Sequence, residues 1–431
     1  MKKIRLTSGL TLIFFIVFAL YANMANANFT PLPELPPPII IQKDGSINPS
    51  TAPLAHVGNI YTLTGNVNNT IEVQCSNIVL DGNGFSITNP PVNTQGLMTP
   101  VGWLPGVHLN GANNVTVTDV TFEDCITGVR VEENSTYVTI INNRVRGTLS
   151  GIVVFSASHV NIVENDFALT QQSFALAMHF LPSSPQENYP SHLQIEGNHI
   201  LGTGQEAPTT VMQPNQYGVW GGFTDSKMVN NNFTRIQGIA LYNIGADNQI
   251  VGNTFQENNQ GVTVNMDPDV WQNNHIYGNN FINNCENAVV GFIRNWPINF
   301  WDNGTVGNYW SDYKGADNNG DGIGDSPYLL ETTYTDYEQN RNVTVENGRD
   351  NYPAMEPFNL PSITVQQPQQ TTLPTSTLPS TGTAEGQVGT TEQPAGFLNV
   401  LHAAVIGVAV LVCASLFFLF KRRDHPVVSL V

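Results

Sequence analysis

A short repeat with Asn at a fixed place most limits how this chain can fold. Its template is an apolar residue, any two residues, Asn, any residue, then Phe, Ile or Val. Copies occur as Leu80…Asn83…Phe85, Ile140…Asn143…Val145, Ile162…Asn165…Phe167, Ile195…Asn198…Ile200, Met228…Asn231…Phe233, Ile250…Asn253…Phe255 and Ile276…Asn279…Phe281. The segment Val117…Phe122 fits with Asp119 displaced by one position. From Asn143 onward the Asn residues are 22, 33, 33, 22 and 26 residues apart, which indicates one repeat unit with insertions in some copies.

Each unit contains short alternating apolar runs, such as Val138-Thr-Ile140 and Val160-Asn-Ile162, which predict half-buried strands. A unit of about 22 residues cannot bury its apolar side chains alone, so copies must stack at about 4.8 Å per coil. We therefore expect an all-β solenoid, a right-handed parallel β-helix. The period is too short for a β-propeller, and the Leu scaffold of leucine-rich repeats is missing.

Stacking places equivalent residues of successive coils above one another. The Phe, Ile or Val position then forms a ladder inside the coil. The Asn position forms a ladder of side-chain amides that bond along the axis at a tight turn. We expect Asn there because it tolerates left-handed backbone conformations.

Three further segments have the same order as in a known family. They are Ile41-Gln-Lys-Asp-Gly-Ser-Ile47, Tyr61-Thr-Leu-Thr-Gly65 and Ile78-Val-Leu-Asp-Gly-Asn-Gly-Phe85. Together with the repeats, they resemble archaeal cell-surface proteins of the NosD-like right-handed β-helix group, over roughly residues 39–355. The resemblance implies an archaeal source and a constant acidic module after the last coil. The group's name also suggests copper-enzyme maturation.

The two ends of the chain predict secretion and a membrane anchor. Lys2, Lys3 and Arg5 precede an apolar run and the small-residue pattern Ala25-Asn26-Ala27, as in a signal peptide. An apolar stretch at 397–420 is long enough to cross a bilayer, and the basic cluster at 421–423 marks the cytoplasmic side. A Thr-, Pro- and Gln-rich tract precedes the apolar stretch, and its composition is typical of an extended stalk. The predicted location is the cell membrane, with one span and an extracellular ectodomain.

These features divide the chain into seven parts. They are a signal peptide (1–27), an N-terminal cap (28–60), β-helix repeats (61–300), an Asp- and Asn-rich C-terminal cap (301–360), a stalk (361–396), a transmembrane helix (397–420) and a cytoplasmic tail (421–431).

The charge of the chain bears on its binding partners, and its cysteines and sequons bear on covalent modification. The formal net charge is −18, and six of the sixteen Lys and Arg residues belong to the two ends, which argues against nucleic acid or an anionic polysaccharide. Cys75, Cys125 and Cys285 are expected to pack in the core, with a Cys75–Cys125 disulfide as the lesser alternative. N-glycosylation sequons begin at Asn28, Asn68, Asn114, Asn134, Asn232, Asn303 and Asn342.

The segment Asp317-Asn-Asn-Gly-Asp-Gly-Ile-Gly-Asp325 has the ligand order of a calcium loop. Asp317, Asn319, Asp321 and Asp325 would offer oxygen donors and Ile323 a backbone carbonyl. Position 12 is Tyr328 rather than Glu, so Asp350 or Asp312 would have to supply the bidentate ligand. The alternative is a turn that needs no ion. We expect structural Ca²⁺ in a cap that covers the open strand edge of the last coil, with Trp301, Tyr309, Trp310 and Tyr313 packing there.

Evidence for catalysis is weak. The carboxylate pairs Asp267/Asp269 and Glu164/Asp166 are the candidates for glycoside hydrolysis, which needs two such groups facing one cleft. The few Lys and Arg residues are scattered, which disfavours a lyase. His159, His179, His192 and His199 lie in one part of the chain, but without paired ligand spacing, so we do not expect copper.

Insertions predicted after Thr88, Phe167 and Ile200 would emerge on one side of the stack and wall a groove. They bring Trp103, His179, Tyr189, Tyr217 and Trp220, which could stack on sugar rings or pack on the coil. The hypothesis we favour is a non-catalytic surface module that binds a polysaccharide or a cell-envelope glycan or has a structural role. The alternatives are a polysaccharide hydrolase, lyase or epimerase, and thirdly a copper-maturation factor.

Overall fold

The computed structural model describes residues 37–89, 105–132, 134–171, 173–179, 189–204, 216–264, 272–290, 299–336 and 341–360. The predicted signal peptide, stalk, transmembrane helix and tail lie outside these residues. Every regular element within them is a β-strand. In this part of the chain, no helix is long and apolar enough to cross a membrane.

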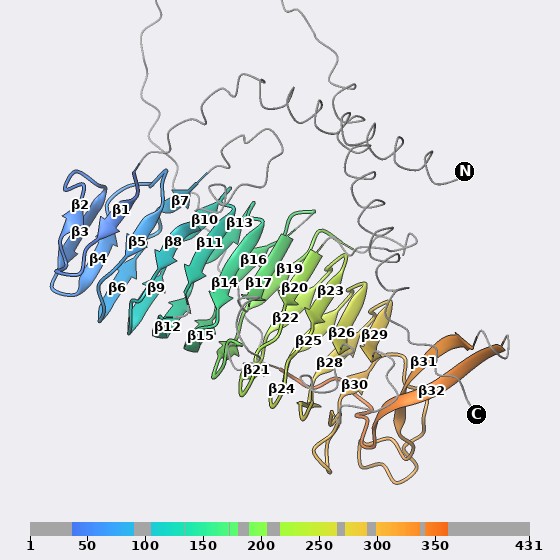
Figure 1. Cartoon of the computed structure of the whole chain (residues 1–431). Helices are drawn as coiled ribbons and strands as arrows, with labels where there is room; N and C mark the ends of the chain where they lie inside the picture. The colour runs from blue at the N-terminus through green and yellow to red at the C-terminus, as the bar shows by residue number, and fades with distance from the viewer. Residues whose placement is uncertain are drawn as a thin grey trace, which may run out of the picture. The chain divides into compact units, whose positions relative to one another are not determined.

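The strands stack into three long sheets, which we name sheets A, B and C, and each coil adds one strand to B, then C, then A (Figure 1). Neighbouring strands are parallel except for the pairs β1–β2 and β3–β4 at the N-terminal end. The chain therefore forms a parallel β-helix, as the repeat predicts.

The bounds of the strands are as follows, in spatial order. Sheet A contains β2 (Ile47–Asn48), β1 (Ile39–Ile41), β5 (Ile71–Val73), β8 (Pro105–Leu109), β11 (Thr127–Val131), β14 (Ser150–Phe155), β17 (Ser173–His179), β20 (Gln216–Trp220), β23 (Ile239–Tyr242), β26 (Gln260–Val264) and β29 (Glu286–Val290). Sheet B contains β27 (His275–Tyr277), β24 (Gln249–Val251), β21 (Lys227–Val229), β18 (Gln194–Glu196), β15 (Ser158–Val163), β12 (Thr136–Ile141), β9 (Val115–Thr118), β6 (Ile78–Asp81), β4 (Ile60–Leu63) and β3 (Leu54–Val57). Sheet C contains β30 (Tyr309–Trp310), β28 (Asn280–Ile282), β25 (Thr254–Gln256), β22 (Asn232–Thr234), β19 (His199–Leu201), β16 (Asp166–Ala168), β13 (Arg144–Arg146), β10 (Thr121–Glu123) and β7 (Ser86–Thr88). An antiparallel hairpin of β31 (Tyr328–Asp336) and β32 (Arg341–Asp350) follows.

Aromatic and aliphatic side chains form the predicted ladder inside the coil. Phe233, Phe255 and Phe281 are fully buried, and their rings stack at 5.1 and 5.0 Å. The stack continues to Trp310 at 4.3 Å and then to Tyr328 at 4.2 Å, so the C-terminal module extends the core. Trp301 and Trp310 are buried as predicted.

The predicted ladder of Asn side chains along the coil axis is also present. The backbone N–H and the side-chain Nδ2 of Asn165 both donate to Oδ1 of Asn198, each at 3.0 Å. Asn198 in turn donates to Oδ1 of Asn231, and the pattern runs on through Asn253, Asn279 and Asn308. These buried amides hold neighbouring coils in one register.

Two details of the predicted ladder are wrong. The left-handed residue is the one before the ladder Asn, as at Asn142 and Asn230 (φ 57° and 56°). The first coils are also shifted, because Ile87 and not Phe85 lies opposite Phe122. Asn83 and Asp119 occupy left-handed turn positions (φ 49° and 53°) outside the ladder.

Asp350 ends the ladder inside the cap. Its carboxylate is fully buried and accepts hydrogen bonds from the backbone N–H of Asn308 at 2.6 Å and from Nε1 of Trp310 at 2.8 Å. Its other oxygen accepts the backbone N–H of Tyr352 at 3.0 Å. Asp350 is therefore a structural acceptor, where the sequence suggested a calcium ligand.

The three described cysteines are free thiols. Cys75 and Cys125 are buried, as expected, and no disulfide joins them. Cys285 is exposed, so its expected core position is wrong, because it lies in a turn that leads into β29.

Candidate functional site

The outer face of sheet A brings together the most distinctive side chains of the described coils. Because side chains alternate along a strand, one column of outward positions runs through the sheet. In register order it contains Glu72, His108, Arg130, Val153, Ala177, Trp220, Tyr242, Thr263 and Val289. Charged residues therefore lie at one end of the column, small residues in the middle, and aromatic residues beyond them.

Phe174, Tyr217, Trp220 and Tyr242 form a cluster on this face, which we call the aromatic patch. The rings of Phe174 and Tyr217 stack at 5.3 Å with an angle of 10°, and Trp220 lies 5.7 Å from Phe174. Tyr242 lies 5.4 Å from Tyr217 on the next coil. All four side chains are half-buried, so part of the cluster faces solvent.

The hydroxyl of Tyr217 is shielded by its neighbours. Burial raises the pKa of Tyr217 to about 12, and the nearby Tyr242 adds to the shift. The phenol is therefore neutral across the physiological range. The patch thus presents aromatic faces and neutral hydroxyl groups.

Glu132 joins two basic side chains on the same face. Nε of Arg130 donates to Oε1 of Glu132 at 2.6 Å, and the ring Nε2 of His108 lies 3.2 Å from the same oxygen. The hydrogen bond with His108, together with Arg130, lowers the pKa of Glu132 against the opposing effect of burial. The guanidinium of Arg130 also lies over the ring of Phe155, 4.4 Å from its centre. We call His108, Arg130 and Glu132 the charged trio.

Long insertions attach along both edges of sheet A. Residues 90–104 and 205–215 precede β8 and β20, where the chain enters the sheet. Residues 180–188, 265–271 and 291–298 follow β17, β26 and β29, where the chain leaves it. The insertions predicted after Thr88 and Ile200 are confirmed, while the one placed after Phe167 follows β17 instead.

Of the predicted ligand-binding residues, the structure brings Tyr217 and Trp220 together on β20. His179 is the last residue of β17, opposite Phe155 on β14. Tyr189 lies apart from them, two residues before the Ser191 bridge to sheet B. Trp103 lies outside the described residues.

Sequence reasoning missed Phe174 and Tyr242. The sequence does contain a signal for Phe174. Phe174 and Tyr217 each precede a small residue, Ala175 or Gly218, and it is this small residue that faces the core. A Cβ on Gly218 would lie 2.6 Å from Cδ1 of Phe233 inside the coil. An aromatic residue before a position restricted in this way points outward.

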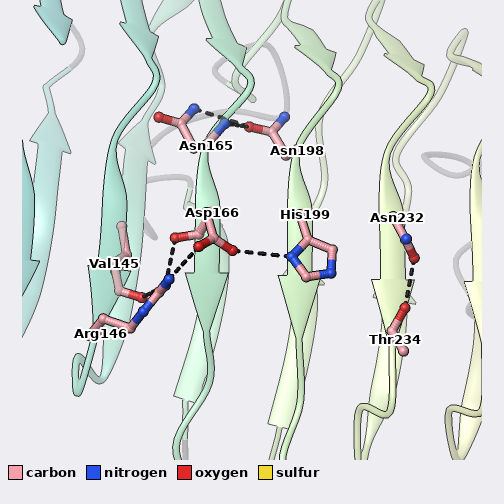
Figure 2. A network of polar contacts seen from close by, with 8 residues as sticks. All are labelled: Val145, Arg146, Asn165, Asp166, Asn198, His199, Asn232 and Thr234. Atoms are coloured by element: carbon pink, nitrogen blue, oxygen red, sulfur yellow. Dashed lines mark hydrogen bonds and ion pairs between the residues drawn. The ribbon is translucent and has the colours of Figure 1, made fainter. Parts of the chain in front are cut away.

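Two of the four candidate catalytic carboxylates, Glu164 and Asp166, lie within the described residues. Asp166 on β16 pairs with Arg146 on β13, and Nδ1 of His199 on β19 lies 3.1 Å from its Oδ1 (Figure 2). Burial opposes ionisation of Asp166, but the bonds to His199 and Arg146 outweigh it and lower the pKa. Glu164 occupies a left-handed turn position (φ 52°) before the ladder. Asp267 and Asp269 lie outside the described residues.

The four histidines noted for copper occupy different places. His159 and His192 stack at 4.8 Å on neighbouring coils, whereas His199 lies in sheet C beside Asp166. Within the described ranges, no group of three His, Cys, Asp or Glu residues is placed to hold a metal ion.

In the acidic loop, the side-chain oxygens accept hydrogen bonds from the loop itself. Asp317 accepts the backbone N–H groups of Gly320 at 2.7 Å and Gly322 at 2.9 Å. Oδ1 of Asp321 accepts the N–H of Ile323, and Oδ2 of Asp325 accepts that of Asn318. Oδ1 of Asp312 accepts from Asn287 at 2.8 Å. Carboxylate and amide oxygens are donors that Ca²⁺ prefers, so the donor chemistry of Asp317, Asn319, Asp321 and Asp325 fits this ion.

Residues 105–305 match the model of the family described as right handed beta helix region. This match covers slightly less than half of the chain and includes both the aromatic patch and the charged trio. It identifies the matched segment as a right-handed β-helix of the kind built from such repeats. No curated protein sequence matches the chain.

Several solved structures are similar to the chain at low identity. A tailspike protein mutant of E. coli bacteriophage HK620, in complex with a pentasaccharide, is 11% identical with a TM-score of 0.33, covering 52% of this chain and 41% of the tailspike chain. A hyperthermoactive exopolygalacturonase from Thermotoga maritima is 13% identical with a TM-score of 0.34, covering 58% and 69%. A DFA-IIIase from Arthrobacter chlorophenolicus A6 without its lid is 14% identical with a TM-score of 0.28, covering 51% and 50%. This chain thus spans less than half the length of the tailspike.

Proposed function

We propose that this protein is a non-catalytic glycan-binding module of the cell surface, tethered by the segment 397–420. The observation that carries the proposal is the aromatic patch on the outer face of sheet A. Aromatic rings that are held rigid and half-exposed suit the apolar faces of sugar rings. The patch spans β17, β20 and β23, so its length suits a short run of sugar residues and not one alone.

The charged trio supplies the polar contacts that such a surface needs. Arg130 uses Nε for Glu132, and its other N–H groups, which have no hydrogen-bond partner in the described part of the chain, are available for ligand hydroxyls. The packing of its guanidinium on Phe155 fixes its position before a ligand arrives. Because Glu132 offsets the charge of Arg130, the trio favours a neutral glycan over a polyanion.

Small side chains connect the patch to the trio. Val153 and Ala177 occupy the outward column between Arg130 and Trp220, and both are buried. A column of small residues between aromatic and charged groups leaves a flat floor. A glycan that runs along the coil axis would contact both groups at once.

A panel of soluble polysaccharides tests this proposal. The full chain in detergent is incubated with each polysaccharide, with and without EDTA, and bound protein and new reducing ends are measured. We expect binding to at least one neutral polysaccharide without new reducing ends or unsaturated products. Absence of binding across neutral and anionic glycans would contradict the proposal.

A hydrolase is the second candidate, because Glu72 and Glu132 lie on one face with His108 between them. Glu72 is opposite His108 in the register, and His108 contacts Glu132. Two carboxylates on one face are the minimum for glycoside hydrolysis. If new reducing ends appear, Glu132→Gln and Glu72→Gln should each abolish them, and Glu72→Gln, which lies outside the charged trio, should leave binding unchanged.

A further inference from the structure

We propose that Asn303 is an N-glycosylation site whose first sugar residue packs in a hollow on the outer face of sheet B. The hollow has a volume of about 530 Å³. It is lined by Gln249, His275, Tyr277, Phe300, Asp302, Asn303 and Gly304. Its size falls within the range of about 300–1,000 Å³ that is usual for small-molecule pockets.

Aromatic rings form one wall of this hollow. The rings of His275 and Phe300 stack at 4.7 Å with an angle of 17°, and Tyr277 follows on the same strand. Phe300 is 41% exposed, which is unusual for a large apolar side chain in this stack of coils. A sugar ring laid on Phe300 would remove this apolar surface from water.

The side chain of Asn303 is oriented for modification. Its Oδ1 accepts the backbone N–H and the Oγ1 hydroxyl of Thr305, at 3.0 and 2.8 Å, and the N–H of Val306 at 2.9 Å. Its Nδ2 has no hydrogen-bond partner among the described residues, and the side chain is exposed. Thr305 is the hydroxyl residue of the sequon Asn303-Gly304-Thr305, so the Asn and the hydroxyl residue of this sequon are hydrogen-bonded to each other.

The turn that carries Asn303 is fixed to the cap. Gly304 has φ 86°, and Asn303 N–H donates to the carbonyl of Val306 at 3.0 Å. Oδ2 of Asp302 accepts both the backbone N–H and the Nδ2 of Asn351 at 2.9 Å. A rigid turn holds Asn303 three residues after Phe300, so packing of the sugar costs little ordering entropy.

Asn232 also accepts the hydroxyl of its own sequon residue, Thr234, at 2.7 Å, but it is half-buried and does not line the hollow. Two further sequons differ in their side-chain contacts. Nδ2 of Asn114 donates to Asn77 at 2.9 Å, and Oδ1 of Asn68 accepts from Thr88 at 2.7 Å. Neither residue lines the hollow. Asn303 is thus singled out by an aromatic wall and not by the sequon alone.

The modification requires a glycan carried on a polyprenyl diphosphate. Nδ2 of Asn303 forms a bond to C1 of the first sugar, the bond from C1 to the diphosphate oxygen breaks, and Nδ2 loses one proton. The leaving group is the polyprenyl diphosphate. No electron transfer is involved, and the amide keeps one N–H.

The test passes the full chain through the secretory pathway of a eukaryotic cell that performs N-glycosylation. Five proteins are compared in detergent, namely wild type, Thr305→Ala, Phe300→Ala, the double variant and Phe300→Tyr. Peptide mass spectrometry reports occupancy of Asn303, and denaturant unfolding reports stability. We expect an occupied Asn303, and a glycan that raises the folding equilibrium constant roughly two- to tenfold, the range of one aromatic contact.

This gain should vanish when Phe300 is Ala and persist in Phe300→Tyr, which keeps the ring. Phe300 is partly exposed, so Phe300→Ala should fold, and its unglycosylated form is the reference. An unmodified Asn303 in the secreted protein would overturn the proposal. An equal gain with Phe300 and with Ala at position 300 would overturn it as well.

Discussion

The orientation of Tyr217 on the surface is determined by packing inside the coil. The next residue, Gly218, faces the interior, where a Cβ would lie 2.4 Å from the carbonyl oxygen of Ala240 and 2.6 Å from Phe233. Only glycine fits at that point, so the strand turns Tyr217 outward and onto Phe174. The aromatic patch therefore depends on packing that no ligand touches.

Gly218→Ala should lower the free energy of unfolding by about 1–3 kcal/mol, because the methyl group overpacks the Phe ladder. Urea unfolding followed by circular dichroism measures the change. Gly65→Ala is the matched control, since its Cβ would lie 3.6 Å from Cβ of Pro53, an ordinary contact. Equal effects of the two substitutions would contradict this account of the core.

Asp350 makes the stability of the cap depend on pH. Burial raises the pKa of Asp350 to about 6, well above the ordinary value of an Asp, although the N–H donors of Asn308 and Trp310 oppose the shift. The folded state thus binds the proton more tightly than the unfolded state. The resulting stability is fully present below about pH 4 and is lost as the pH rises through about 6.

We compare wild type with Asp350→Asn, which cannot titrate. The stability of wild type relative to the variant should fall between pH 4 and pH 6, by at most about 3 kcal/mol. Denaturant unfolding at a series of pH values measures this difference. A difference that stays constant would show that the cap does not shift the pKa of Asp350, and one that grows with pH would show that the cap favours the carboxylate; either result would contradict this account.

Among the elements, the buried Asn ladder lies at the turn between sheets B and C, where it links each coil to the next. Asn198→Ala would leave the carbonyl of Ile162 and the amide of Asn165 without partners in the interior. We expect a loss of about 3–5 kcal/mol in the free energy of unfolding, since each unsatisfied group costs about 1–3 kcal/mol. Asn161→Ala, which removes one exposed bond of 3.3 Å, should change it by less than about 0.5 kcal/mol.

The acidic loop of the cap makes a separate prediction. We propose that Ca²⁺ binds Asp317, Asn319, Asp321, Asp325 and the carbonyl of Ile323. Because the described carboxylates are not placed for a metal ion and bond within the loop, the loop would have to exchange these hydrogen bonds for the ion. Added Ca²⁺ should then raise the melting temperature relative to EDTA, because a ligand that binds only the folded state stabilises it. Asp317→Asn with Asp321→Asn should remove the response, whereas Mg²⁺ should reproduce it poorly. A melting temperature unaffected by Ca²⁺ would favour a turn that needs no ion.

At the scale of the whole molecule, periodic features could be predicted from the sequence. The Phe and Asn ladders were recognised because each coil repeats the same residue types at one spacing. The predicted register is wrong in the first coils. Phe85 and Val120 replace Asn at the ladder position there, so the sequence lacks the residue that fixes the register. The left-handed position lies one residue before the predicted one, where Gly or Asn stands in most coils, as at Asn142, Gly197 and Gly252.

The candidate site was harder to predict than the fold. The sequence predicts Tyr217 and Trp220 in an inserted loop, but they lie on β20. Their partners Phe174 and Tyr242 come from adjacent coils with insertions of different lengths between them. Side chains that meet across coils can be paired only when the register of each coil is known, and the insertions hide it.

The aromatic patch is the central claim, and the affinity of Trp220→Ala for a bound polysaccharide tests it most directly. Tyr137→Ala is the control, since Tyr137 is 61% exposed and lies outside sheet A. Isothermal titration of each full-length protein with the same polysaccharide gives the dissociation constants. We expect Trp220→Ala to weaken binding by roughly tenfold or more, and Tyr137→Ala to leave it unchanged. Unchanged binding by Trp220→Ala, or an equal loss in both variants, would contradict the assignment of the glycan site to sheet A.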